Sequence, residues 1–81
     1  MNKRIIMYST KTCGFCKAAK AYFSANNISY TEIDVGEDRE KAREMIEKSG
    51  QMGVPVIVVG EGSDAEVIVG FDQERIAEAI K

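Results

Sequence analysis

The sequence predicts an α/β fold, with a four-stranded mixed sheet flanked by three helices, and three observations lead to this prediction. Short apolar runs rich in β-branched residues alternate with stretches in which apolar residues recur at helical spacing. These runs follow one another in the order βαβ and then ββα, with a further helical stretch between the two units. At 81 residues, 44% of them hydrophobic, the chain has room for one core, so we expect a single domain over residues 1–81.

The first half of the chain has the pattern of a βαβ unit. Residues 3–8 form a short apolar run that is typical of a buried strand. Residues 16–26 carry apolar side chains at helical spacing and end in two asparagines, and residues 28–34 alternate in the manner of a second strand. Because such crossovers are right-handed, the two strands should be parallel neighbours.

The second half begins with the pattern of a helix followed by a hairpin. Residues 38–49 combine an apolar stripe with many charges, and Gly50 is a suitable residue to end a helix. Residues 54–59 form the most apolar run, whose alternate side chains would face two buried layers, which predicts a central strand. The short link to residues 66–69 predicts that these two strands are antiparallel.

The last predicted element is a helix over residues 72–80. Asp72 is placed to be its N-cap, because a carboxylate there can accept a free backbone N–H. Phe71, just before the cap, can pack against Ile76 as a hydrophobic staple. This helix would complete the covering of the sheet.

The composition argues against several classes of partner and catalyst. A net charge of −2, from 11 basic and 13 acidic residues spread along the chain, argues against nucleic acid and anionic membranes as partners. The absence of His excludes His-based acid–base catalysis. No apolar stretch approaches the roughly 20 residues that span a bilayer, and residues 1–8 do not resemble a signal peptide, so we expect a cytoplasmic protein.

Cys13 and Cys16 form a CxxC pair between a predicted strand and a predicted helix. The first sulfur would lie beside free helical N–H groups and the positive end of the helix dipole, which favours a thiolate. Cys13 is therefore the predicted nucleophile, and Cys16, about one turn along the helix, is the predicted resolving thiol. Structural zinc normally requires four Cys or His ligands, so two cysteines without His predict no metal site within one chain.

Three motifs together resemble those of glutaredoxins over nearly the entire chain: TCGFCK near the N-terminus, QMGVPVIVV after the second predicted helix and GFD before the last one. The resemblance implies a thioredoxin-like (glutaredoxin) fold and an enzyme that is a thiol–disulfide oxidoreductase. It also implies a cis peptide bond before Pro55, opposite the reactive sulfur, and places Gly53 where the family usually has Thr. The GFD triplet is similar to that of the thioredoxin-like glutaredoxins that serve ribonucleotide reductase.

The same resemblance implies a substrate-binding groove. The backbone of Val54 would hold the cysteinyl part of glutathione or of a substrate peptide, in the manner of an added β-strand. Lys11 would meet a carboxylate, and Asp72 would receive the γ-glutamyl amine. Phe15 would line the groove, and Phe71 occupies a position where the family commonly has a small residue.

The implied function is reduction of protein disulfides or glutathione-mixed disulfides by the CxxC dithiol. Electrons would come from glutathione, as a co-substrate, or from a flavin disulfide reductase, and the acceptors would be disulfide-containing proteins such as ribonucleotide reductase. We expect a monomer with no tightly bound cofactor. Two alternatives stay open: a dimer in which the Cys13 residues of two chains and glutathione hold a [2Fe–2S] cluster, and a non-catalytic domain that docks peptides at the Val54 edge.

Overall fold

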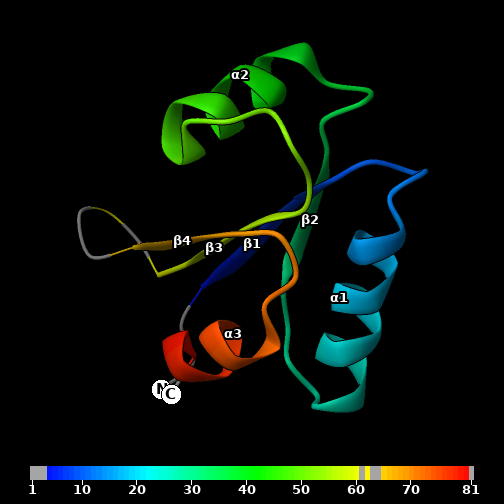
Figure 1. Cartoon of the computed structure of the whole chain (residues 1–81), viewed down its shortest axis with the longest axis vertical. Coiled ribbons are helices and arrows are strands. Elements are labelled where there is room, and N and C mark those ends of the chain that lie inside the picture. The colour runs from blue at the N-terminus through cyan, green and yellow to red at the C-terminus, as the bar shows by residue number, and fades with distance from the viewer. Residues whose placement is uncertain (1–3, 61, 63–64, 81) are drawn as a thin grey trace.

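Strands and helices follow one another along the chain in the order that the sequence predicts (Figure 1). The computed structural model describes residues 4–60, 62 and 65–80. Within these ranges the elements are β1 Ile5–Ser9, α1 Gly14–Ala25, β2 Thr31–Asp34, α2 Arg39–Ser49, β3 Val56–Val59, β4 Glu66–Val69 and α3 Gln73–Ala79. None of the helices in this part of the chain is long and apolar enough to cross a bilayer.

The four strands form one mixed sheet in the order β2-β1-β3-β4. β1 runs parallel to β2 and antiparallel to β3, and β3 is antiparallel to β4. The parallel pairing is possible because α1 carries the chain back across the sheet between β1 and β2, and the β3–β4 hairpin follows from the short link between those strands. The predicted thioredoxin-like architecture is confirmed.

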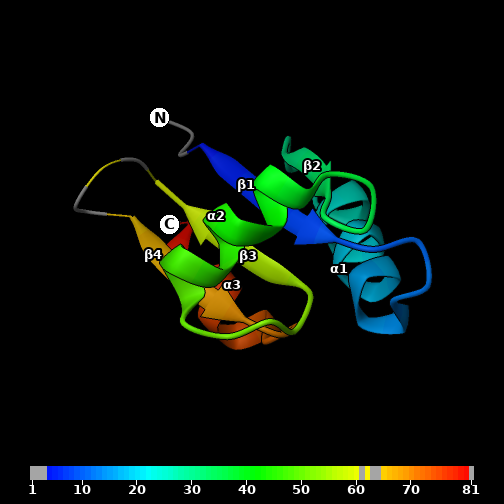
Figure 2. The ribbon, with the colours of Figure 1, turned by 90° about the horizontal axis from the view of Figure 1, so that it is seen from above.

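Helices cover both faces of the sheet: α1 and α3 lie on one face and α2 lies on the other (Figures 1 and 2). Strand β3 shows how the sequence produces two layers of core. Ile57 and Val59 belong to the cluster under α1 and α3, whereas Val56 and Val58 belong to the cluster under α2. All four side chains are buried, so the prediction of a central strand covered on both faces is confirmed.

The helix ends follow from capping chemistry. Asp38 and Asp72 are the N-caps of α2 and α3, and each carboxylate accepts a backbone N–H from the first turn of its helix. Gly50 ends α2 with a φ of 75°, a left-handed conformation that glycine adopts without a Cβ clash. Phe71, before the second of these caps, packs against the cluster that contains Ile76.

Several predicted boundaries differ from the structure. α1 begins at Gly14, two residues before the predicted start, because Cys13 is the N-cap and its sulfur accepts the first-turn N–H. β2 begins at Thr31 and not at residue 28, because the ladder with β1 starts there, while Ile28 and Tyr30 pack on the core outside the ladder. β3 begins two residues later than predicted, and Lys3, the predicted start of the first strand, lies outside the described residues.

The buried Tyr8 ties β1 to α2. Its hydroxyl donates a hydrogen bond to Glu44 Oε2 at 2.9 Å. We expect Tyr8→Phe to lower the free energy of unfolding by about 0.5–1.5 kcal/mol, measured by urea denaturation at neutral pH, because one buried hydrogen bond is lost. In a double-mutant cycle, Glu44→Gln should add little to Tyr8→Phe; fully additive losses would show that the two groups do not interact.

Because of the same contact, the free energy of unfolding should depend on pH in the alkaline range. Burial, and then the hydrogen bond and charge of Glu44, raise the pKa of Tyr8 from 10.0 to about 12. The folded state therefore holds this proton more tightly than the unfolded state does. The contribution of the neutral Tyr8 is fully present below about pH 10 and is lost as the pH rises through about 12, a loss that Tyr8→Phe should remove.

Candidate active site

The two cysteines lie at the N-terminal end of α1, where the chain leaves the carboxyl end of β1. Cys13 is the N-cap, with φ −83° and ψ 115°, and its Sγ accepts a hydrogen bond from the backbone N–H of Cys16 at 3.1 Å. Both cysteines are free thiols. Cys13 is partly exposed, whereas Cys16 is 1% exposed, so only the first sulfur is open to a partner from solution.

Burial sets the electrostatics of the second thiol. Desolvation, and after it the hydrogen bond with the Cys13 side chain, raise the pKa of Cys16 to about 12. The Thr10 backbone and the charge of Lys20 lower it in part. At neutral pH Cys16 is therefore a neutral thiol, held directly behind Cys13.

A second segment, from the loop between α2 and β3, meets the first cysteine. The Cys13 thiol lies 3.7 Å from the carbonyl oxygen of Val54 and donates toward it. The Val54–Pro55 peptide bond is cis, and Pro55 is fully buried. The Pro55 carbonyl accepts the Gly70 N–H at 2.8 Å, which joins this segment to the chain after β4.

The side chain of Gln51 fixes the backbone one residue before Val54. Gln51 Oε1 accepts the Gly53 N–H at 2.6 Å, and Gln51 Nε2 donates to the Gly53 carbonyl at 2.9 Å. Both polar groups of the Gly53 backbone are thus used within the loop. A Cβ at Gly53 would come within 2.7 Å of Gln51 Oε1, so a side chain at this position would displace the amide.

This geometry, a thiol pair at a helix start facing a segment with a cis-proline, agrees with the comparison with known proteins. The glutaredoxin family profile matches residues 5–63. The chain belongs to the glutaredoxin family. It is 39% identical over 77 residues to a glutaredoxin-like 8.6 kDa protein in the rubredoxin operon of Clostridium pasteurianum, covering 95% of this chain and 97% of that protein.

Two further family members extend the comparison. Glutaredoxin 3 of Escherichia coli is 36% identical over 66 residues, which cover 82% of this chain and 75% of that protein. The crystal structure of a glutaredoxin from Archaeoglobus fulgidus superposes with a TM-score of 0.79, covering 95% of this chain and 85% of that one, at 22% identity. The first supports a glutaredoxin-like thiol oxidoreductase, and the second supports the fold.

The remaining residues implied by the glutaredoxin resemblance lie in different surroundings. Phe15 is 70% exposed and is the second residue of α1. Lys11 is exposed and lies 3.4 Å from a carboxylate oxygen of Glu37. Asp72 serves as the cap of α3 and accepts the N–H of residue 75 at 3.2 Å, while the Phe71 ring packs on Tyr22 with centroids 6.0 Å apart.

Sequence reasoning missed a polar group on the α1 side of the sheet. Lys20 Nζ lies 2.6 Å from Glu32 Oε2, and the buried Ser9 hydroxyl donates to the same oxygen at 2.8 Å. These residues come from α1, β2 and β1, so only the folded chain brings them together. The sequence carried one usable sign, the spacing of four between Cys16 and Lys20, which places both on one helix face.

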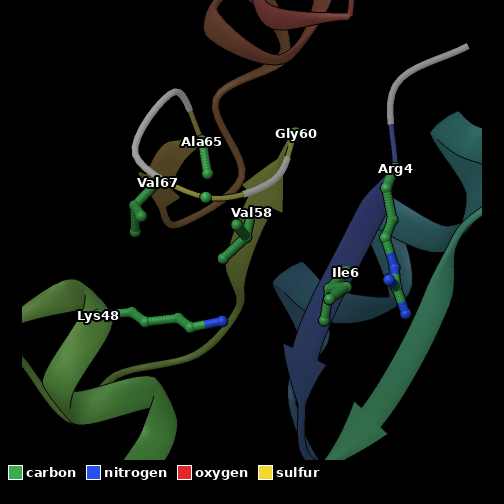
Figure 3. A pocket seen from close by; sticks show the side chains of 8 residues that line it. Arg4, Ile6, Lys48, Val58, Gly60, Ala65 and Val67 are labelled. Atoms are coloured by element: carbon green, nitrogen blue, oxygen red, sulfur yellow. The ribbon is translucent and has the colours of Figure 1, made fainter.

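The cysteines follow the carboxyl end of β1, and a cavity lies at the opposite end of the sheet. That cavity, of about 510 Å³, lies over the start of β1 and is lined by Arg4, Ile6, Lys48, Val58 and Val67 among others (Figure 3). It contains neither cysteine. Across the described ranges, no three His, Cys, Asp or Glu side chains come together as a metal-binding group.

Proposed function

We propose that the protein reduces protein disulfides and glutathione-mixed disulfides, with Cys13 as the attacking sulfur and Cys16 as the resolving thiol. The observation that carries the proposal is the contrast between the two sulfurs: one is open to solution at a helix N-terminus, and the other is buried behind it. The backbone N–H of Cys16 donates to the Cys13 sulfur at 3.1 Å, which holds that sulfur at the start of the helix. The family assignment supports the same reaction class.

The reaction proceeds in two exchanges. The Cys13 thiolate attacks a sulfur of the substrate disulfide, which forms a mixed disulfide and releases one substrate sulfur as a thiolate. Cys16 then loses its proton to solvent and attacks the Cys13 sulfur. A Cys13–Cys16 disulfide forms, the bond to the second substrate sulfur breaks, and that sulfur leaves with the electron pair. The substrate gains two electrons and the dithiol is oxidised.

Substrate would bind along the segment that contains Val54. The Val54 carbonyl lies beside the Cys13 sulfur, so an extended chain paired with this backbone would bring its own sulfur to Cys13. The buried Pro55 anchors one end of this segment, and the hydrogen bonds between Gly53 and Gln51 hold the other end. The exposed Phe15 ring would cover one side of the bound chain. Phe71 and Asp72 would form the far end, with Asp72 receiving a γ-glutamyl amine.

Lys11 would bind a glutathione carboxylate, in competition with Glu37. Both side chains are largely exposed, at 78% and 69%, and they are only 3.4 Å apart. We expect Lys11→Met to raise KM for a glutathione-mixed disulfide by about two- to fivefold with little change in kcat. Glu37→Gln should lower KM for the same substrate. Both effects should be small, since exposed ion pairs contribute below about 1 kcal/mol. Uncharged hydroxyethyl disulfide serves as the control substrate. Equal KM changes for both substrates would contradict this role.

The electron donor would be glutathione or a flavin disulfide reductase, and disulfide-containing proteins such as ribonucleotide reductase would be acceptors in the cytoplasm. The test oxidises the protein and compares reduction by glutathione with reduction by thioredoxin reductase and NADPH, followed by transfer to insulin. Reduction by at least one donor, coupled to insulin reduction, is expected. Failure with both donors, in a protein that retains its Cys13–Cys16 disulfide, would contradict the proposed function.

A further inference from the structure

The resolving step needs a thiolate at a buried position. Cys16 must be ionised to attack, because the thiolate and not the thiol is the nucleophile. Because burial raises the pKa of Cys16 to about 12 in the reduced protein, very little of this thiol is ionised at neutral pH. Any group that stabilises negative charge on this sulfur therefore speeds the second exchange without being needed for the first.

Lys20 is placed to supply a positive charge that stabilises the Cys16 thiolate. It follows Cys16 by four residues on α1, so the two side chains lie on one face of the helix, about one turn apart. That face packs on the sheet, since Cys16 and Phe23, about two turns further along the helix, are both buried. The Lys20 side chain is 38% exposed, which leaves part of it within the helix–sheet interface.

Two residues of the sheet hold the ammonium in place. Glu32 on β2 pairs with Met7 on β1, a residue of the core under α1, and its Oε2 lies 2.6 Å from Lys20 Nζ. The Ser9 hydroxyl, 1% exposed, donates to the same oxygen at 2.8 Å and so orients the carboxylate. The hydrogen bond from Lys20, and then that from Ser9, lower the pKa of Glu32, which keeps it ionised at neutral pH.

The charged and polar groups that act on Cys16 come from α1 and its start and from the loop after β1, and further groups act through Lys20. On α1 these are Cys13, which disfavours a second negative charge, and Lys20, which favours it. The Thr10 backbone, in the loop after β1, also favours it. From β2, Glu32 acts on Lys20, as does Tyr30 just before that strand. Once Cys13 is bound in a mixed disulfide its negative charge is gone, and the charge of Lys20 remains.

We propose that Lys20 is a positioning residue of the resolving step: held by Glu32 and Ser9, its ammonium stabilises the Cys16 thiolate that attacks the mixed disulfide at Cys13. The inference rests on the proposed function and assigns no role to Lys20 in the first exchange. The alternative is that the Lys20–Glu32 pair only fastens α1 to the sheet.

The test separates the two exchanges with the chromogenic disulfide DTNB in excess. The reduced protein should release one equivalent of the coloured thiolate in a phase that depends on DTNB concentration, as Cys13 reacts. It should release a second equivalent in a phase whose rate does not depend on the DTNB concentration, as Cys16 resolves the adduct. Lys20→Met should slow the second phase about two- to fivefold at pH 7, the range of a partly exposed charge, and shift its pH profile upward. Lys20→Arg should restore both.

Controls separate local charge from net charge and from folding. Lys48→Met removes the same charge from α2, at the other end of the sheet, and should leave the second phase unchanged. Lys20→Gln provides a polar replacement if the Met variant is poorly folded. A second phase whose rate and pH profile are unchanged in the Lys20 variants, or changed equally by Lys48→Met, would overturn the inference alone. Absence of any second phase in the wild-type protein would instead overturn the proposed function.

Discussion

Cys13→Ser should abolish disulfide reduction, while Cys16→Ser should retain the first exchange and stop at a mixed disulfide. The expected loss for the Cys13 variant is at least about a thousandfold, because its buried neighbour is almost wholly un-ionised and cannot replace it. The measurement is insulin reduction, together with intact-protein mass spectrometry after mixing with a glutathione disulfide. Cys16→Ser should gain one glutathione, held through Cys13.

The two cysteine variants serve as controls for each other, because each removes one sulfur atom and leaves the other in place. Circular dichroism and urea denaturation should show that both remain folded. An adduct of equal stability on Cys13→Ser, or insulin reduction by that variant, would contradict the assignment of the two roles.

Phe23→Ala should cause the largest loss of stability of any single truncation on α1. Its side chain is fully buried, and its ring lies 4.9 Å from that of Tyr30 and 5.9 Å from that of Tyr22. Removing a buried ring costs about 3–5 kcal/mol through lost burial and the cavity that remains. A domain of this size has roughly 0.05–0.15 kcal/mol of stability per residue, so much of the total would be lost. Urea denaturation of the reduced protein measures this.

Ile46→Ala on α2 is the matched control, since Ile46 is 36% exposed and loses less on truncation. We expect a cost of less than about 1.5 kcal/mol for this variant, because its side chain is only partly removed from water. Similar losses for Phe23→Ala and Ile46→Ala would show that the cluster under α1 is not the main source of stability.

Local patterns predicted the architecture well where a single element determined them. The alternation of residues 56 to 59 between the two cores could be predicted because the side-chain period of a strand is two. Asp72 and Gly50 could be predicted as helix ends from capping chemistry alone. The start of α1 was placed too late because Cys is not among the common N-cap residues, although the sulfur of Cys13 fills that place.

Features that depend on contacts between elements could not be predicted. Ser9, one residue beyond the predicted first strand, is a buried residue of β1, and its hydroxyl donates to Glu32 on the neighbouring strand. Two further contacts arise from side-chain positions that no motif specifies. They are the hydrogen bonding of Gln51 to the Gly53 backbone and the ion pair of Lys11 with Glu37. The cysteine pair itself was visible in the sequence, and its immediate electrostatic surroundings were not.

Timed alkylation of the reduced wild-type protein with iodoacetamide, followed by peptide mass spectrometry at a series of pH values, tests the central claim most directly. At pH 7 Cys13 should be labelled first and Cys16 should stay unlabelled, becoming reactive only as the pH approaches its pKa of about 12 or when the protein unfolds. Labelling of Cys16 at neutral pH as fast as Cys13, in the folded protein, would contradict the division between an exposed attacking sulfur and a buried resolving one.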